Sequence, residues 1–407
     1  MYQYRKPPKY PEVKAYNNTS NVADRNAIVI SWIHTLPEYT AADAGPPPIT
    51  TEKRRREQQQ PIGSLALIEE APRPSLSSLS IPSCASSPKN QMLNLRLYEP
   101  VIEFNALDLN ALPRAARELV SSIIEIGSSQ DILPHAVKST IMEAVDAQDP
   151  MPRLWRYAFK SAADDEADAL LPGRIPAFGE VERICRQARE WQQYDHEEVS
   201  WNCTVHGRLL ELIFQDENGQ LYDDPNDLCA KTTQFNRLAP TATVSHIDFV
   251  PIGTRPLVPR IKTKESGVHW QDAQLQIGIW HAAQWAFLRW AATNKLQRGR
   301  IDEGGKGGGS VKVPQGQEEG HDAFEAKVLS VMSDLGFIPG IIIQGHRWHL
   351  VLSTYENRKA KLWTDRQFGS TQTCLESYSI IAGMRRLMAW ERDVYMPWFK
   401  SNILDNI

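Results

Sequence analysis

The stretches Ser245-His246-Ile247-Asp248-Phe249 and Pro259-Arg260-Ile261-Lys262-Thr263-Lys264 decide the fold of this chain. The longer segments that contain them, Thr241 to Pro251 and Leu257 to Lys264, are rich in Val, Ile, Thr and Phe, and a proline-containing turn separates them, so the sequence predicts two successive strands. Asp248 lies near the end of the first strand, and Lys262 and Lys264 lie on the second. Because side chains alternate between the faces of a strand, the two lysines share one face, about 6.6 Å apart.

Helical and extended segments alternate on both sides of this strand pair. Apolar residues recur at helical spacing in residues 115–126, 136–144, 178–214, 271–296 and 374–399. Shorter segments with strand composition follow the long central helix, at 340–344, 348–354 and 361–368. The order of helix, strands, helix, strands and helix predicts one α/β domain of about 300 residues.

Changes in composition set the ends of this domain. Residues 1–95 are rich in Pro, Ser, Thr and charge, so we expect a mostly disordered arm. Its exception is a short amphipathic helix near 24–36, which we expect to dock on the domain. The domain itself spans 96–400, and a Gly-rich flexible insertion interrupts it at 299–320.

Composition narrows the class of protein. With 407 residues, 42% apolar residues and 12 tryptophans, the chain can build a sizeable core. The formal net charge of -4 gives no overall basic surface, so polyanion binding requires a local patch. The 5 cysteines contain no CxxC pair, which argues against a disulfide framework or a zinc cluster.

Targeting signals are weak. The amino terminus lacks the apolar core of a signal peptide, and no apolar stretch is long enough to span a membrane. We therefore expect an intracellular protein, in the nucleus or the cytoplasm. The run Lys53-Arg54-Arg55-Arg56 is interpreted as a nuclear-import signal, as a phosphate-binding patch, or as a solvated basic run in a linker. The sequence leaves the oligomeric state open.

A set of short motifs accompanies the strand pair. In chain order they are Glu198-x-x-Trp201-Asn202-x-x-x-His206, Ile247-Asp248-Phe249, Ile261-x-Thr263-Lys264, Ala273-Gln274-Leu275 with Trp280, Gly345-His346-x-Trp348, Gly369-x-Thr371, and Trp390 with Tyr395 and Trp398. In order and spacing this set resembles a family of fungal proteins with a PD-(D/E)XK nuclease-like domain, part of the restriction-endonuclease-like superfamily. The resemblance spans about residues 96–400 and implies a mixed sheet flanked by helices.

The resemblance also implies a site. In that superfamily an Asp and a second acidic residue bind Mg²⁺, and a Lys orients the attacking water. By position, Asp248 corresponds to the metal-binding aspartate and Lys264 to the catalytic lysine. Glu198 corresponds to the helix carboxylate that completes some of these sites, and Gln274 to a polar residue of the following helix. The second acidic position falls on Lys262.

Lys262 conflicts with metal-assisted hydrolysis. Mg²⁺ needs hard oxygen ligands, whereas two ammonium groups at this spacing repel each other by about 2.5 kcal/mol at an effective dielectric constant of about 20. The first hypothesis is a module that binds nucleic acid or another phosphate- or carboxylate-bearing ligand, with weak or no nuclease activity. The second is an active Mg²⁺-dependent nuclease with a relocated carboxylate. The third is a small-molecule enzyme that uses Lys262 and Lys264.

The histidines are open to more than one interpretation. His246 precedes Asp248 by two residues on the same strand face. It is interpreted as a proton shuttle, as a metal ligand or as an ordinary hydrogen-bonded strand residue. His346 and His349 are three residues apart on a predicted strand, so they face opposite sides and do not bind one metal together. Beneath the site we expect a packed, hydrogen-bonded cluster of Trp201, Asn202 and His206.

Overall fold

The computed structural model describes residues 102–149, 151–214, 232–233, 235, 258–265, 267, 270–304 and 317–405. Several predicted features lie outside the described residues. They are the arm 1–95 with its helix near 24–36, the basic run Lys53–Arg56, the strand with His246 and Asp248, and the centre of the Gly-rich insertion. The fold below concerns the described residues alone.

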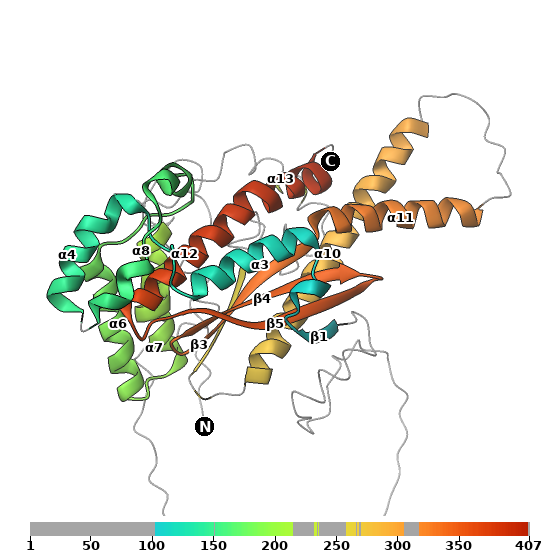
Figure 1. The fold of residues 1–407 in the computed structure, drawn as a ribbon. Helices are drawn as coiled ribbons and strands as arrows, with labels where there is room; N and C mark the ends of the chain where they lie inside the picture. Colours follow the sequence, from blue (N-terminus) through green and yellow to red (C-terminus); the bar gives the residue numbers. More distant parts are fainter. Residues whose placement is uncertain are drawn as a thin grey trace, which may run out of the picture.

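A mixed sheet forms the centre of the domain (Figure 1). Its strands are β1 (Ile102–Ala106), β2 (Arg260–Lys264), β3 (Phe337–Gln344), β4 (Arg347–Glu356) and β5 (Lys359–Ser370). They lie in the order β1-β5-β4-β3-β2, with β2 parallel to β3, β1 parallel to β5, and the other pairs antiparallel. The near-continuous apolar run of β3 suits a strand covered on both faces.

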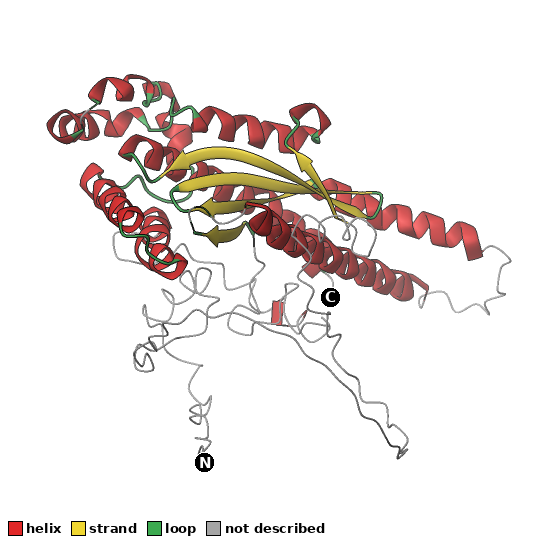
Figure 2. Cartoon of the chain, turned by 90° about the horizontal axis from the view of Figure 1, so that it is seen from below, coloured by secondary structure: helices red, strands yellow, loops and turns green. Residues whose placement is uncertain are grey.

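Helices cover both faces of this sheet (Figures 1 and 2). The α-helices are α3 (Arg114–Gly127), α4 (Lys138–Gln148), α5 (Asp165–Ala169), α6 (Phe178–Gln193), α7 (Glu198–Trp201), α8 (Gly207–Phe214), α10 (Trp270–Gly304), α11 (Gln317–Leu335), α12 (Cys374–Trp390) and α13 (Met396–Phe399). Short 3₁₀ turns occupy Leu109–Ala111, His135–Val137, Pro152–Tyr157 and Ala162–Asp164, and π-helical turns occupy Asn202–His206, Glu391–Tyr395 and Lys400–Leu404. The α/β fold class predicted from the sequence is confirmed.

The two helical layers touch opposite faces of the sheet through close contacts at glycine. On one side, Gly278 of α10 lies against the ring of Phe104 and the side chain of Leu362. On the other, Gly383 of α12 lies against the ring of Phe368. The side covered by α10 is called the α10 face below, and the side covered by α12 and α3 is called the α12 face.

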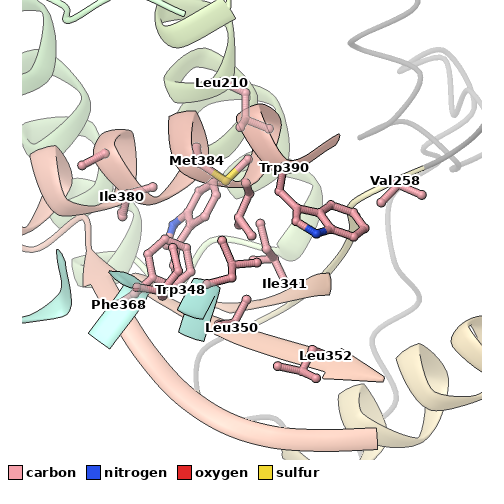
Figure 3. Close-up of a cluster of buried hydrophobic side chains, with 14 of the residues drawn as sticks. Leu210, Val258, Ile341, Trp348, Leu350, Leu352, Phe368, Ile380, Met384 and Trp390 are labelled. Carbon is pink, nitrogen blue, oxygen red and sulfur yellow. The ribbon is translucent and has the colours of Figure 1, made fainter. Parts of the chain in front are cut away.

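The larger apolar cluster fills the α12 face and also includes residues of α10 such as Trp285 and Leu288. Figure 3 shows part of this cluster under α12. Figure 3 shows Trp348 and Phe368 from the sheet packed beneath Met384 of α12, and all three side chains are buried. Gly369 allows α12 to approach β5, because a Cβ there would meet the Ile380 side chain and the α12 backbone at less than 3 Å. Because α12 packs so closely on β5, this part of the α12 face has no room for a ligand between helix and strand.

The region after β2 differs from the sequence prediction. α10 runs to Gly304 and α11 begins at Gln317, so both ends of the predicted insertion 299–320 are helical. Strong helix formers such as Glu, Gln, Lys and Arg extend the two helices into sequence that has no clear apolar period. β1 was not predicted either, because its five residues are too short and too mixed to give a clear strand pattern.

Candidate functional site

Lys262 and Lys264 lie on the α10 face, as their shared strand parity predicts. Lys262 is opposite Ile342 of β3, which belongs to an apolar cluster with Ile277 of α10. The Lys262 ammonium lies 5.8 Å from the centre of the Trp280 ring, within range of a cation–π contact. β2 is the end strand of the described sheet, so the lysines lie at its edge.

Burial changes the acidity of one of these lysines. Lys262 is half-buried, and this desolvation is the main reason that its pKa is lowered from the ordinary value. The charge of Lys264 lowers the pKa further, whereas the charge of Glu198 opposes the shift. The repulsion between the two lysines is therefore the smaller cause of the lowered pKa, and burial is the larger one.

Glu198 is held from the opposite face of β2. Its carboxylate Oε1 accepts a hydrogen bond from the Thr263 hydroxyl at 2.6 Å, and its backbone N–H donates to the Glu265 carboxylate at 3.1 Å. Thr263 lies between the two lysines in sequence, so its side chain points away from theirs. Glu198 is therefore near enough to act on the charge of Lys262, yet it is bound on the other face.

A buried hydrogen-bonded cluster continues from Thr263 toward the turn after β3. Asn202 Nδ2 donates to the Thr263 hydroxyl at 3.0 Å, and Asn202 Oδ1 lies 3.1 Å from His206 Nδ1. His206 Nε2 lies 2.9 Å from the Gly345 carbonyl oxygen. Complete burial lowers the pKa of His206 to about 4, although the bond to Gly345 acts in the opposite direction. The predicted cluster is confirmed, including the buried Trp201.

Gln274 is placed away from the lysine pair. Its Nε2 donates to the Thr364 hydroxyl of β5 at 2.7 Å. Since β5 is separated from β2 by β4 and β3, this bond ties the start of α10 to the far side of the sheet. The structure thus brings Lys262 and Lys264 together and does not add Gln274 to them. Asp248 and His246 lie outside the described residues, so their part in the site stays a prediction.

The structure also separates His346 and His349, although the prediction of one shared strand was wrong, because His346 lies in the turn between β3 and β4. His346 belongs to the cluster on the α12 face, where its ring nitrogens contact Thr371 at 2.9 Å and Gln192 at 2.6 Å. His349 lies on the α10 face and contacts Asp365 at 2.7 Å. Sequence reasoning missed Asp365, because only an irregularity in the β4–β5 pairing brings it to His349.

The geometry and the sequence together place the chain in a family. The sequence model of one superfamily of nucleases matches residues 142–230 and 221–396, which is more than half of the chain. The chain belongs to the PD-(D/E)XK nuclease superfamily. Its mixed sheet flanked by helices agrees with the restriction-endonuclease-like fold of that superfamily. No curated protein and no solved structure matches the chain. A fungal origin stays a prediction.

PD-(D/E)XK nucleases commonly use Mg²⁺, and the described residues do not fit such a site. Within them, no group of three or more His, Cys, Asp or Glu side chains is placed to hold a metal ion. Glu198 is bound to Thr263 on the other face, and Lys262 stands at the predicted position of the second acidic ligand. We therefore derive no catalytic step through a metal.

None of the helices in the described ranges is long and apolar enough to cross a bilayer.

Proposed function

We propose that this PD-(D/E)XK nuclease-like protein binds nucleic acid or another ligand that carries phosphate or carboxylate groups, with weak or no nuclease activity. One observation carries the proposal. The position of the second metal-binding acid holds Lys262, which is half-buried against Trp280 and lies on the same face as Lys264. A pair of ammonium groups favours an anion at the place where related nucleases attract a cation.

The surroundings of the lysine pair support an anionic ligand. Burial strengthens an ion pair because water screens it less, so a phosphate on Lys262 is held more tightly than on a fully exposed lysine. Trp280 limits the motion of the Lys262 side chain, which reduces the entropy lost on binding. Neither effect depends on Asp248. We propose that Asp248 marks the ancestral metal position.

The substitution Lys262→Glu tests this function. It should weaken the binding of a single-stranded oligonucleotide by about tenfold at low salt, because one phosphate contact is lost and a repulsive charge is added. The slope of log affinity against log salt should fall by about 0.7. Fluorescence anisotropy titrations at several salt concentrations measure both quantities. Isothermal titration calorimetry should also show tighter Mg²⁺ binding by the variant, because an acidic ligand is restored.

Lys138→Glu is the matched control, since it makes the same charge change at an exposed residue of α4. Its affinity and salt slope should stay close to those of the wild-type protein. The proposal fails if the wild-type protein shows no salt-dependent binding of DNA or RNA. It also fails if two results are found together: the wild-type protein binds Mg²⁺ in the micromolar range and cuts DNA, and Asp248→Ala abolishes both the binding and the cleavage. That result establishes the active nuclease with a relocated carboxylate.

A second candidate function rests on the lowered pKa of Lys262. A larger neutral fraction of this amine favours attack on a carbonyl compound, with loss of water to form an imine. With pyruvate as the probe, sodium borohydride should reduce the imine to a stable secondary amine on Lys262. Peptide mass spectrometry should find this adduct on Lys262 at a much higher level than on Lys138. Equal labelling of the two lysines contradicts lysine chemistry.

A further inference from the structure

A bulge in β5 places an acidic side chain on the α10 face. Leu350 of β4 pairs with Arg366, and the next residue, Val351, pairs with Thr364, so Asp365 has no partner in the ladder. A bulge of this kind redirects a side chain that a regular strand would turn to the other face. Thr364 and Asp365 accordingly both bond to groups on the α10 face, at 2.7 Å in each case.

Asp365 determines which nitrogen of His349 carries the proton. His349 Nδ1 lies 2.7 Å from Asp365 Oδ1, and the Asp365 side chain is 54% exposed. An ionised carboxylate only accepts hydrogen bonds, so in the neutral imidazole Nδ1 carries the hydrogen and Nε2 has a free lone pair. Asp365 thus makes His349 Nε2 a hydrogen-bond acceptor.

Among the residues that the structure describes, this acceptor is buried and has no hydrogen-bond partner. His349 is only 9% exposed, and Nε2 forms no hydrogen bond with the protein. The ring of Trp270, at the start of α10, lies 4.7 Å from the imidazole ring, centre to centre. Buried polar atoms in native proteins are nearly always hydrogen-bonded. A buried acceptor without a partner therefore indicates a place where a ligand can donate a hydrogen bond.

The open acceptor and the lysine pair share the α10 face. His349 of β4 is opposite Ile342 of β3, which in turn is opposite Lys262 of β2. Two strand spacings separate the His349 and Lys262 backbones by about 10 Å. The two ring nitrogens of an imidazole point in widely different directions, and Nδ1 is directed at β5. Nε2 is therefore directed away from β5, and the lysine pair lies on the β3 and β2 side of His349.

We propose that His349 Nε2 accepts a hydrogen bond from a ribose 2′-hydroxyl of a strand whose phosphates bind Lys262 and Lys264, so that the protein selects RNA over DNA. This inference rests on the proposed function and names its substrate class. The 2′-hydroxyl is the donor that distinguishes RNA from DNA along the whole backbone. Because Nε2 is buried and the Trp270 ring packs against the imidazole, contact with the hydroxyl requires the indole to move aside. Asp365 acts as a positioning residue, because it sets the tautomer of His349 and need not touch the ribose.

The substitution Asp365→Asn tests the inference with little change in shape. The Asn side chain can donate to Nδ1, which moves the imidazole hydrogen to Nε2 and removes the acceptor. Three single strands of one sequence serve as ligands: RNA, DNA and 2′-fluoro RNA, which lacks the donor. The wild-type protein should bind RNA about tenfold more tightly than either analogue, and Asp365→Asn should lower this ratio, because Nε2 no longer accepts the hydroxyl hydrogen.

Three further variants distinguish the loss of the His349 acceptor from effects of side-chain size and of charge. His349→Gln keeps an acceptor oxygen and should retain part of the RNA preference, whereas His349→Phe should lose it. Asp334→Asn removes one negative charge at an exposed residue of α11 and should leave the ratio unchanged. Circular dichroism and thermal melting show whether each variant is folded.

The outcomes separate this inference from the proposed function. Equal binding of RNA, DNA and 2′-fluoro RNA by the wild-type protein overturns the inference and leaves the binding function intact. An RNA preference that survives both Asp365→Asn and His349→Phe also overturns it. If none of the three strands binds in a salt-dependent way, the proposed function itself fails.

Discussion

Asp168→Ala should lower the free energy of unfolding by about 3 kcal/mol. The Asp168 carboxylate accepts hydrogen bonds from Lys160 Nζ at 2.6 Å and from Arg385 Nη1 at 2.7 Å, and both Asp168 and Arg385 are 4% exposed. Burial by itself would raise the pKa of Asp168, but the bonds from Lys160 and Arg385 outweigh it and lower the pKa. Removal of the carboxylate leaves a buried guanidinium without its counter-ion, which is the costly part of the change.

The expected loss lies at the lower end of the range for buried pairs. A cavity of about 450 Å³ is lined in part by Lys160, Asp168 and Arg385, so water can solvate some of the uncovered charge. Arg385 also donates to the carbonyl oxygens of Pro172 and Asp168, at 3.1 and 2.9 Å, which keeps part of its hydrogen bonding. Urea denaturation followed by circular dichroism measures the change.

Glu118→Ala is the matched control for this prediction. Glu118 forms an ion pair with Arg114 on the surface of α3, with side-chain exposures of 66% and 93%. Such a pair contributes less than about 1 kcal/mol. The double variant Asp168→Ala with Arg385→Met should recover part of the stability, because no buried charge remains unpaired. Equal losses for Asp168→Ala and Glu118→Ala contradict a structural role of the buried pair.

Acidification from pH 7.5 to pH 4.5 should lower the free energy of unfolding by on the order of 7 kcal/mol through three buried histidines. Burial is the main cause that lowers the pKa of His206 and His346 to about 4 and that of His281 to about 3, from 6.5. The unfolded chain takes up these protons near pH 6.5, whereas the folded chain excludes them until pH 4 or below. Their stabilising effect is therefore complete above pH 6.5 and is lost as the pH falls toward 4.

Urea denaturation at several pH values measures this dependence. His281→Asn keeps a polar atom near Ser353, whose hydroxyl lies 2.7 Å from His281 Nδ1, and it removes one titrating group. This variant should lose about 2.5 kcal/mol less than the wild-type protein over the same pH interval. His135→Gln changes an exposed histidine and should leave the dependence unaltered. A wild-type stability that is constant between pH 7.5 and 4.5 contradicts neutral buried histidines.

The sequence predicted the regular elements well because their signals are local. The apolar period of residues 115–126 corresponds to α3, and the segments at 340–344, 348–354 and 361–368 lie inside β3, β4 and β5. The α10–α11 region was predicted less well, since a Gly-rich stretch interrupts two helices whose polar ends show no apolar period. β1 is held by pairing with β5, which is remote in sequence and leaves no local pattern.

The candidate site was predicted in part. Strand alternation alone placed Lys262 and Lys264 on one face, and the resemblance to PD-(D/E)XK nucleases predicts that Lys262 stands at an acidic position. Neither argument could show that Trp280 buries Lys262 or that Glu198 binds Thr263 on the opposite face. Those contacts depend on how α10 and α7 pack on β2.

The sequence by itself determined the superfamily and the order of the helices and strands, whereas the assignment of Lys262 to an acidic position stays a prediction. Only the tertiary structure decided the burial of Lys262, the pairing of Arg385 with Asp168, and the contact of His349 with Asp365. Periodicity and alternation follow from the geometry of neighbouring residues, so they can be read along the chain. Burial, buried ion pairs and the register of a bulge depend on residues that are far apart in sequence, and packing alone brings these residues together.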